Sequence, residues 1–171
     1  MKTNKITILG LLIAQALALH FIERFIPIPI PVPGVKLGLA NIITLFTIII
    51  FGFKEALIVL IGRIFLGSLF GGGFSSFLFS ITGGLVSSII MALLYLKFRK
   101  HFSLPTISIA GAVTHNIGQI AIASLIVNNP NLFYYLPVLI VSGIITGLFI
   151  GLIVQFTLKP LSSILNLNIE G

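Results

Sequence analysis

The sequence is short of charged residues and contains neither cysteine nor aspartate. Charged residues make up 8% of the 171 positions and hydrophobic residues 57%, with a mean hydropathy of +1.22. A typical soluble domain carries about 25% charged residues, because its surface faces water. This composition excludes a soluble enzyme and a disordered tail, and the absence of cysteine excludes a secreted disulfide scaffold. We therefore expect an integral membrane protein.

The shortage of acidic residues also limits the chemistry that the chain can perform. Its acidic residues are Glu23, Glu55 and Glu170. Without aspartate there is no aspartate-rich site of the kind that holds Mg²⁺ and diphosphate, and no cysteine pair or carboxylate cluster suggests another metal. The run Gly71-Gly-Gly73 is not followed by the Lys-Ser/Thr of a phosphate-binding loop. We expect a protein that is not an enzyme, holds no metal or cofactor, and hydrolyses no ATP itself.

The formal net charge of +7 would suggest nucleic acid as a partner of a soluble protein. Here the basic residues lie mostly between apolar runs, where they indicate topology instead. With a cytoplasmic N-terminus, the outer segments carry two of them, Arg24 and Lys36, and Arg63 lies inside a run. The inner segments carry the other seven, so both termini are predicted to be cytoplasmic, with no nucleic-acid partner: Lys2, Lys5, Lys54, Lys97, Arg99, Lys100 and Lys159.

Six apolar stretches approach the length of about 20 residues that a spanning helix requires. They predict a single all-α domain over residues 1–171, a six-helix bundle in a membrane. An N-terminal secretion signal ending near Ala16-Leu-Ala18 is an alternative that leaves five spans, but the long apolar run favours ordinary insertion. The predicted spans are residues 6–25, 37–51, 55–69, 74–96, 104–127 and 136–158.

The first predicted helix has two different faces. At 100° per residue, Ala16, His20 and Glu23 share one face. Ionisable groups such as His20 and Glu23 are costly within a membrane span, which makes them functional candidates. Small residues occupy the opposite face. We expect the polar face to point into the bundle and the small-residue face to remain available to another helix. The small residues are Gly10, Ala14 and Ala18.

Arg63 lies within the third predicted helix and needs an acceptor, because arginine keeps its charge. The acceptor is either Glu23, in an ion pair, or an anionic part of a ligand. Asn41 lies near the outer end of the second predicted helix, after Lys36. Together with the proline-rich run at residues 27–34 it would cover a cavity. Lys36 also has a simpler interpretation, as a solvated loop charge.

The fifth predicted helix carries the densest polar cluster, with His115, Asn116 and Gln119 within five residues. A polar stripe of this kind cannot face lipid. Hydrogen bonding between helices would explain one or two of these groups, whereas three favour a surface that lines a ligand. The stripe consists of Ser108, Gly111, Ala112, His115, Gln119 and Ala123, with Asn116 at its edge.

Glycines also recur at helical spacing. Gly143, Gly147 and Gly151 form one stripe on the sixth predicted helix, and Gly83-Gly84 interrupts the fourth. Small residues four apart let two helix backbones approach within a membrane. We interpret the stripe as packing inside the bundle in preference to an oligomer contact.

Two motifs resemble those of a known family. Pro33-Gly-Val-Lys-Leu-Gly-Leu-Ala-Asn41 and Gly111-Ala-Val-Thr-His-Asn-Ile-Gly-Gln119, with Gly83-Gly84 between them, resemble the Gx transporters. Members of that family are often labelled heptaprenyl diphosphate synthase component I. Their plan is similar to that of the substrate-binding subunits of energy-coupling-factor transporters, which have six helices, cytoplasmic termini and a pocket open to the outer half.

The resemblance implies partners as well as a fold. In such subunits an Ala-x-x-x-Ala stripe on the first helix docks onto a transmembrane coupling subunit, and Ala14 and Ala18 match it. Cytoplasmic ATPases complete the transporter, so the resemblance implies a multi-pass protein of the cytoplasmic membrane of a prokaryote. The resemblance implies no particular substrate, because no vitamin-specific signature is present. The synthase label finds no support in the residues, since aspartate is missing.

These observations predict a membrane subunit of an energy-coupling-factor importer that captures a small, anionic or amphipathic metabolite. The alternative is a non-catalytic membrane subunit of a heptaprenyl diphosphate synthesis assembly, and an accessory subunit of a redox complex ranks third. The candidate substrate-binding residues are His115, Asn116, Gln119, Arg63, Glu23, His20, Asn41 and Lys36. The candidate partner-docking residues are Gly10, Ala14 and Ala18.

Overall fold

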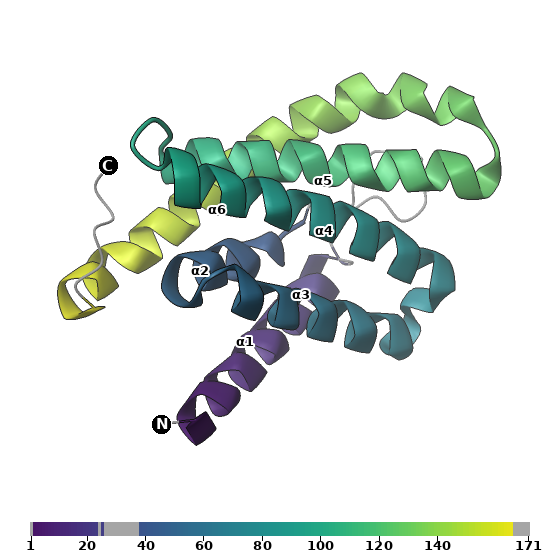
Figure 1. The fold of residues 1–171 in the computed structure, drawn as a ribbon. Helices are drawn as coiled ribbons and strands as arrows, with labels where there is room; N and C mark the ends of the chain where they lie inside the picture. The colour runs from purple at the N-terminus through teal and green to yellow at the C-terminus, as the bar shows by residue number, and fades with distance from the viewer. Residues whose placement is uncertain (1, 24, 26–37, 166–171) are drawn as a thin grey trace.

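The computed structural model describes residues 2–23, 25 and 38–165, and every regular element within them is a helix (Figure 1). The predicted all-α class is therefore confirmed. Within these described residues, a π-helical turn, η1, and a 3₁₀ turn, η2, supplement six α-helices. The elements are α1 (Lys2–Glu23), α2 (Asn41–Phe51), α3 (Phe53–Gly67), η1 (Ser68–Gly72), α4 (Gly73–Phe98), α5 (Leu104–Val127), η2 (Pro130–Tyr135) and α6 (Leu136–Leu165).

The ends of α5 follow from local chemistry. The Ser103 side chain accepts a hydrogen bond from the Thr106 backbone N–H, and Pro105 occupies the first turn, where no N–H is needed. Asn128 ends the helix in the left-handed conformation, with φ of 52°. The helix therefore covers Leu104–Val127, the same residues as the fifth predicted span.

The second helix is shorter than predicted. It begins at Asn41, because Gly38 has a φ of +83° and residues 38–40 form a turn instead of the helix that the 37–51 span requires. It ends at Gly52, whose φ is +96°. Eleven residues at 1.5 Å each extend about 16 Å, roughly half the hydrocarbon thickness of a bilayer.

The glycine run at residues 71–73 separates two helices without an extended loop. The chain leaves α3 through η1, and Gly73 then reverses its direction with a φ of +67°. α3 accordingly covers Phe53–Gly67 instead of the predicted 55–69. The sixth helix is longer than predicted, since it continues past Pro160 to Leu165.

In the part of the chain that the structure describes, four helical stretches are long and apolar enough to cross a membrane: Asn4–Glu23, Gly73–Phe98, Leu104–Val127 and Pro130–Leu161. Large apolar side chains cover the outward faces of these stretches, among them Leu125, Phe149 and Phe156. Such a surface is suited to lipid. The chain is therefore a multi-pass membrane protein in character, while the count of six spans and the orientation stay predictions.

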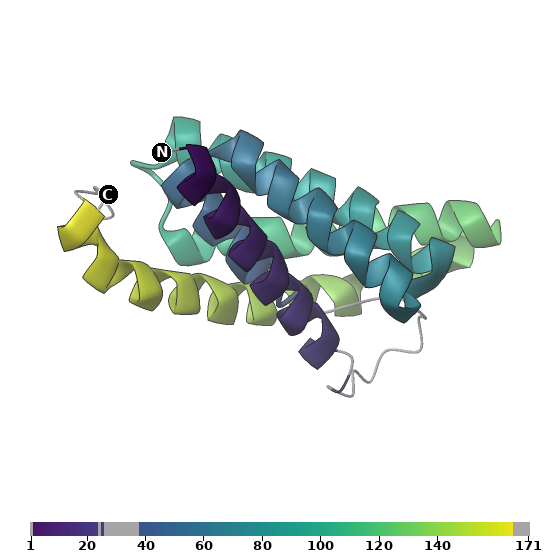
Figure 2. The ribbon, with the colours of Figure 1, turned by 90° about the horizontal axis from the view of Figure 1, so that it is seen from below.

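The helices pack as a bundle in which α5 lies between α4 and α6 (Figures 1 and 2). α1 crosses the other side of the bundle and packs mainly on α3. The start of α1, the end of α6, the α2–α3 turn and the α4–α5 connection lie toward one end of the bundle. The α3–α4 turn and the α5–α6 connection lie toward the other end. Residues such as Leu45, Ile48 and Met91 fill the core between them.

Glycines allow the closest helix contacts. A Cβ atom at Gly147 would lie 2.6 Å from Ile109 Cα, and one at Gly151 would meet the backbone of Pro105. Both neighbours belong to α5, so the stripe on α6 packs inside the bundle, as predicted. Gly118 and Gly83 also bring α5 and α4 close together, because a Cβ atom at Gly118 would lie 3.0 Å from Gly83 Cα.

Candidate functional site

The two faces of α1 lie where the sequence places them. His20 and Glu23 are buried with Ala16, whereas Ala14 and Ala18 are exposed. His20 packs on α3, since a Cβ atom at Gly67 would lie 3.2 Å from His20 Nε2. Gly10 is exposed as well, and a Cβ atom there would meet nothing within 4 Å. The polar face of α1 is thus buried in the bundle and the small-residue face is exposed, as helical periodicity predicts.

The Glu23 carboxylate links the end of α1 to the start of α2. Its Oε1 accepts a hydrogen bond from the backbone N–H of Gly38 at 2.6 Å, and its Oε2 accepts one from Leu39 at 3.3 Å. Hydrogen bonds to an ionised acceptor are stronger than those between neutral groups. The carboxylate therefore holds the turn that precedes α2, including the left-handed conformation of Gly38.

Arg63 faces the same region from α3. Its Nη2 donates to Asn41 Oδ1 at 3.4 Å, and its Nε has no hydrogen-bond partner within the described part of the chain. Glu23 is the acidic residue whose charge acts on Arg63. The hydrogen bonds thus differ from the predicted direct ion pair, because the carboxylate binds backbone amides and the guanidinium binds Asn41. Lys36, which was expected nearby, lies outside the described residues.

The polar residues of α5 point to two different neighbours. Asn116 Nδ2 donates to the backbone oxygen of Leu139 in α6 at 2.8 Å. His115 and Gln119 pack against α4, because a Cβ atom at Gly83 would lie 3.2 Å from His115 Cε1 and 2.8 Å from Gln119 Cγ. Asn116 therefore makes the interhelical hydrogen bond that was the alternative interpretation for one member of this cluster. Ligand contact by the three residues stays a prediction.

Two polar groups result, one on each side of α4. One group consists of Glu23, Asn41 and Arg63, and the other consists of His115 and Gln119 of α5. All five residues are buried. Gly84, next to Gly83, faces Leu60 and Ile64 of α3. The glycine pair therefore lets α4 pack closely between α3 and α5.

The sequence prediction missed Thr44. This side chain is 0% exposed, and its hydroxyl has no hydrogen-bond partner among the residues that the structure describes. It follows Asn41 by three residues, so the two side chains share one face of α2. That spacing was the available signal, but threonine is common in membrane helices and usually bonds to the preceding turn, as Thr47 does to the Ile43 oxygen at 2.6 Å.

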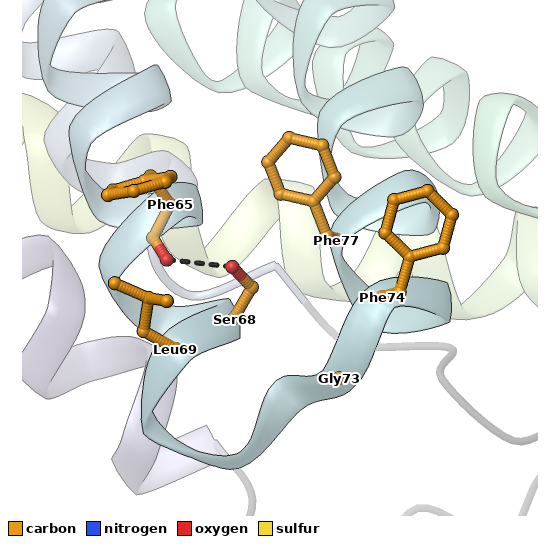
Figure 3. A pocket seen from close by; sticks show the side chains of 6 residues that line it. All are labelled: Phe65, Ser68, Leu69, Gly73, Phe74 and Phe77. Carbon is orange, nitrogen blue, oxygen red and sulfur yellow. Dashed lines mark hydrogen bonds between the residues drawn. The ribbon is translucent and has the colours of Figure 1, made fainter.

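Two cavities lie elsewhere on the described helices. One, of about 330 Å³, lies between α3 and α4 where η1 joins them, and Figure 3 shows its aromatic lining. The other, of about 280 Å³, lies between α1, α2 and α6 and includes Gln15. Neither of these two is lined by a predicted substrate-binding residue. The first is lined by Phe65, Ser68, Leu69, Gly73, Phe74 and Phe77.

Comparison with known proteins matched one family model to most of this bundle. Among the described residues no three histidine or acidic side chains come together to suggest a metal centre. No curated protein and no solved structure matched the chain. The family model described as heptaprenyl diphosphate synthase component I matches residues 12–157, and that description names one component of a larger assembly. The chain therefore belongs to the heptaprenyl diphosphate synthase component I family, as the resemblance of its two motifs predicted.

Proposed function

We propose that the chain is the substrate-binding membrane subunit of an energy-coupling-factor importer. The observation that carries this proposal is the division of α1 into a buried polar face and an exposed face of small residues. A lipid-facing helix normally presents large apolar side chains, whereas small residues let a second helix approach closely. Gly10, Ala14 and Ala18 therefore form a docking face for a transmembrane coupling subunit.

A groove extends this docking face. Gln15, the neighbour of Ala14, lines the cavity of about 280 Å³ together with Phe46 of α2 and Val154 of α6. A partner helix laid across Ala14 and Ala18 would have its side chains beside this groove. The contact would then involve three helices, which suits a stable subunit interface better than one helix alone.

The buried polar residues support the capture of a substrate. Polar side chains within a membrane bundle are costly, and this chain keeps two groups of them. Under the proposal, His115, Asn116 and Gln119 contact a small metabolite from α5. Arg63, Glu23 and His20 set its charge preference, with Asn41 and Lys36 on its outer side. The subunit itself performs no catalysis, and separate cytoplasmic ATPases supply the energy.

This function requires a topology of six spanning helices with both termini on the cytoplasmic side of a prokaryotic cytoplasmic membrane. Its support is that basic residues lie on helix ends at one end of the bundle, where the start of α1, the start of α3, the end of α4 and the end of α6 are found (Figures 1 and 2). Lys54 is the second residue of α3 and Lys97 lies in the last turn of α4. Lys5 pairs there with Glu55, with 2.6 Å between Nζ and Oε1. Cytoplasmic segments carry such an excess of lysine and arginine.

The docking face is the part of this proposal to test first. The chain is coexpressed with candidate coupling and ATPase subunits, and both co-purification and ATP-dependent uptake of a metabolite library are measured. The double variant Ala14→Leu, Ala18→Leu should lose both properties, because bulky side chains keep the partner helix away. Val141→Leu, on an exposed face of α6, is the matched control and should retain them. Undiminished co-purification of the double variant, or no ATP-dependent uptake with any subunit set, would refute the proposal.

A second candidate is a non-catalytic membrane subunit of a heptaprenyl diphosphate synthesis assembly. It is favoured by the description of the family and by the apolar cavity between α3 and α4, whose Phe65, Phe74 and Phe77 suit a prenyl chain (Figure 3). Co-purification with a soluble, aspartate-rich synthase in place of an ATPase pair would support this candidate. The absence of such a synthase from the purified complex would count against it.

A further inference from the structure

A set of buried hydrogen-bond donors lies between α2 and α3. We propose that Arg63, Asn41 and Thr44 bind an oxyanion, a carboxylate or a phosphate group carried by the substrate. This inference rests on the proposed function and adds the chemical class of the ligand. Each of the three side chains is at most 4% exposed, and each has an atom without a hydrogen-bond partner within the described chain. These atoms are Arg63 Nε, Asn41 Nδ2 and Thr44 Oγ1.

The three side chains form one group. Arg63 Nη2 reaches Asn41 Oδ1 at 3.4 Å, which places the guanidinium against the first turn of α2. Thr44 lies one turn further along the same face of that helix. Asn41 Nδ2 stays close to Gly38, where a Cβ atom would lie 2.9 Å from it. The absence of a side chain at Gly38 therefore leaves the amide room beside the turn.

The group can donate many hydrogen bonds but has little capacity to accept them. A guanidinium has five N–H donors and no acceptor, and the Asn41 oxygen is already used by Arg63. Leaving buried donors unpaired is costly, particularly for a charged group. A ligand that supplies several acceptor oxygens removes this cost, whereas an amine or other cation would add to it. Carboxylate and phosphate are the common groups that fit such donors.

Charge also favours an oxyanion here. Glu23 offsets part of the Arg63 charge at a distance, but its two oxygens accept hydrogen bonds from Gly38 and Leu39. It therefore leaves the Nε donor of Arg63 without an acceptor. The N-terminal end of α2 adds a partial positive charge beside Asn41. The ligand thus meets positive charge at the point where its oxygens would bind.

Thr44→Val is the most informative variant, because it removes a hydroxyl that has no partner and keeps the shape of the side chain. It should leave the stability of the unliganded protein unchanged or slightly raised. Thr47→Val is its matched control, since Thr47 is equally buried one turn away and its hydroxyl donates to Ile43. Arg63→Lys keeps the positive charge but loses the planar set of donors.

The experiment measures anion-dependent thermal stability of the purified full chain in detergent. The chain has no tryptophan and no cysteine, so the folded fraction is followed by size-exclusion chromatography after heating. The probes are inorganic phosphate, diphosphate and succinate, each compared with chloride at equal ionic strength. Parallel samples in nanodiscs of phosphatidylglycerol or phosphatidylcholine show whether the oxyanion belongs to a soluble molecule or to a lipid headgroup.

At least one probe should raise the midpoint temperature of unfolding, for both wild type and Thr47→Val, above the value measured in chloride. For Thr44→Val the half-saturating concentration should rise roughly tenfold, as expected for one lost hydrogen bond to a charged ligand, and for Arg63→Lys it should rise further. The inference is overturned if no probe exceeds chloride, or if Thr44→Val responds as wild type does. Uptake is measured separately: ATP-dependent uptake of a neutral metabolite without anion binding would reject this site and leave the transporter proposal standing.

Discussion

Gly147→Ala tests whether backbone contact between α5 and α6 holds the bundle together. The added Cβ atom would lie 2.6 Å from Ile109 Cα and 3.0 Å from the Ser108 oxygen. Both are backbone atoms, so no side-chain rotation relieves the overlap, and carbon atoms prefer a separation of about 3.5–4.0 Å. The two helices must therefore move apart by about 1 Å. Overpacking of this kind costs about 1–3 kcal/mol.

The higher helix propensity of alanine offsets part of this loss, by up to about 1 kcal/mol. We expect Gly147→Ala to lower the free energy of unfolding by about 1–2 kcal/mol and the midpoint by several degrees. Heating followed by size-exclusion chromatography in detergent measures the shift. Gly10→Ala is the control, because nothing lies within 4 Å of its added Cβ atom. If Gly147→Ala has the same midpoint as Gly10→Ala, the inferred contact between the α5 and α6 backbones is wrong.

Three further substitutions test single contacts by the same heating assay. Glu23→Gln should lower the free energy of unfolding by about 1–3 kcal/mol, because the amide can no longer accept from both Gly38 and Leu39; an unchanged midpoint would contradict this. Asn116→Ala removes the 2.8 Å hydrogen bond to Leu139 and should cost about 0.6–1.7 kcal/mol, so a larger loss would indicate a second role. Lys5→Met should change stability by less than about 1 kcal/mol, since its pair with Glu55 is partly exposed, and a larger change would show that this pair holds α1 in place.

Features that depend on local chemistry could be predicted from the sequence. α5 is the best case, because a serine cap, a proline in the first turn and Asn128 at the end act within a few residues. The buried and exposed faces of α1 followed from helical periodicity alone. The internal packing of the Gly147 stripe also followed, since three glycines four residues apart leave one helix face without side chains.

Features that depend on a distant partner could not be predicted. Hydropathy extends the second helix back to residue 37, whereas the structure begins it at Asn41 because Glu23, far earlier in the chain, holds the preceding turn. The two roles on α5 were hidden for a similar reason. Asn116 and Gln119 lie three residues apart, yet one meets α6 and the other meets α4 at a glycine. Thr44 could be recognised as a candidate binding residue only from the structure, which places Arg63 beside Asn41, on the same helix as Thr44.

α1 gives the importer proposal a consequence that the synthase alternative lacks. The same helix carries Glu23, which anchors the turn before the proposed oxyanion site, and Ala14 and Ala18, which belong to the proposed docking face. A helix transmits displacement along its axis, so a change at Glu23 on ligand binding would move the alanine face. Ligand and coupling subunit would then alter each other's affinity by the same factor. A subunit that only positions a prenyl chain for a soluble enzyme has no reason to show this reciprocity, so measuring coupling-subunit affinity with and without a bound oxyanion separates the two functions.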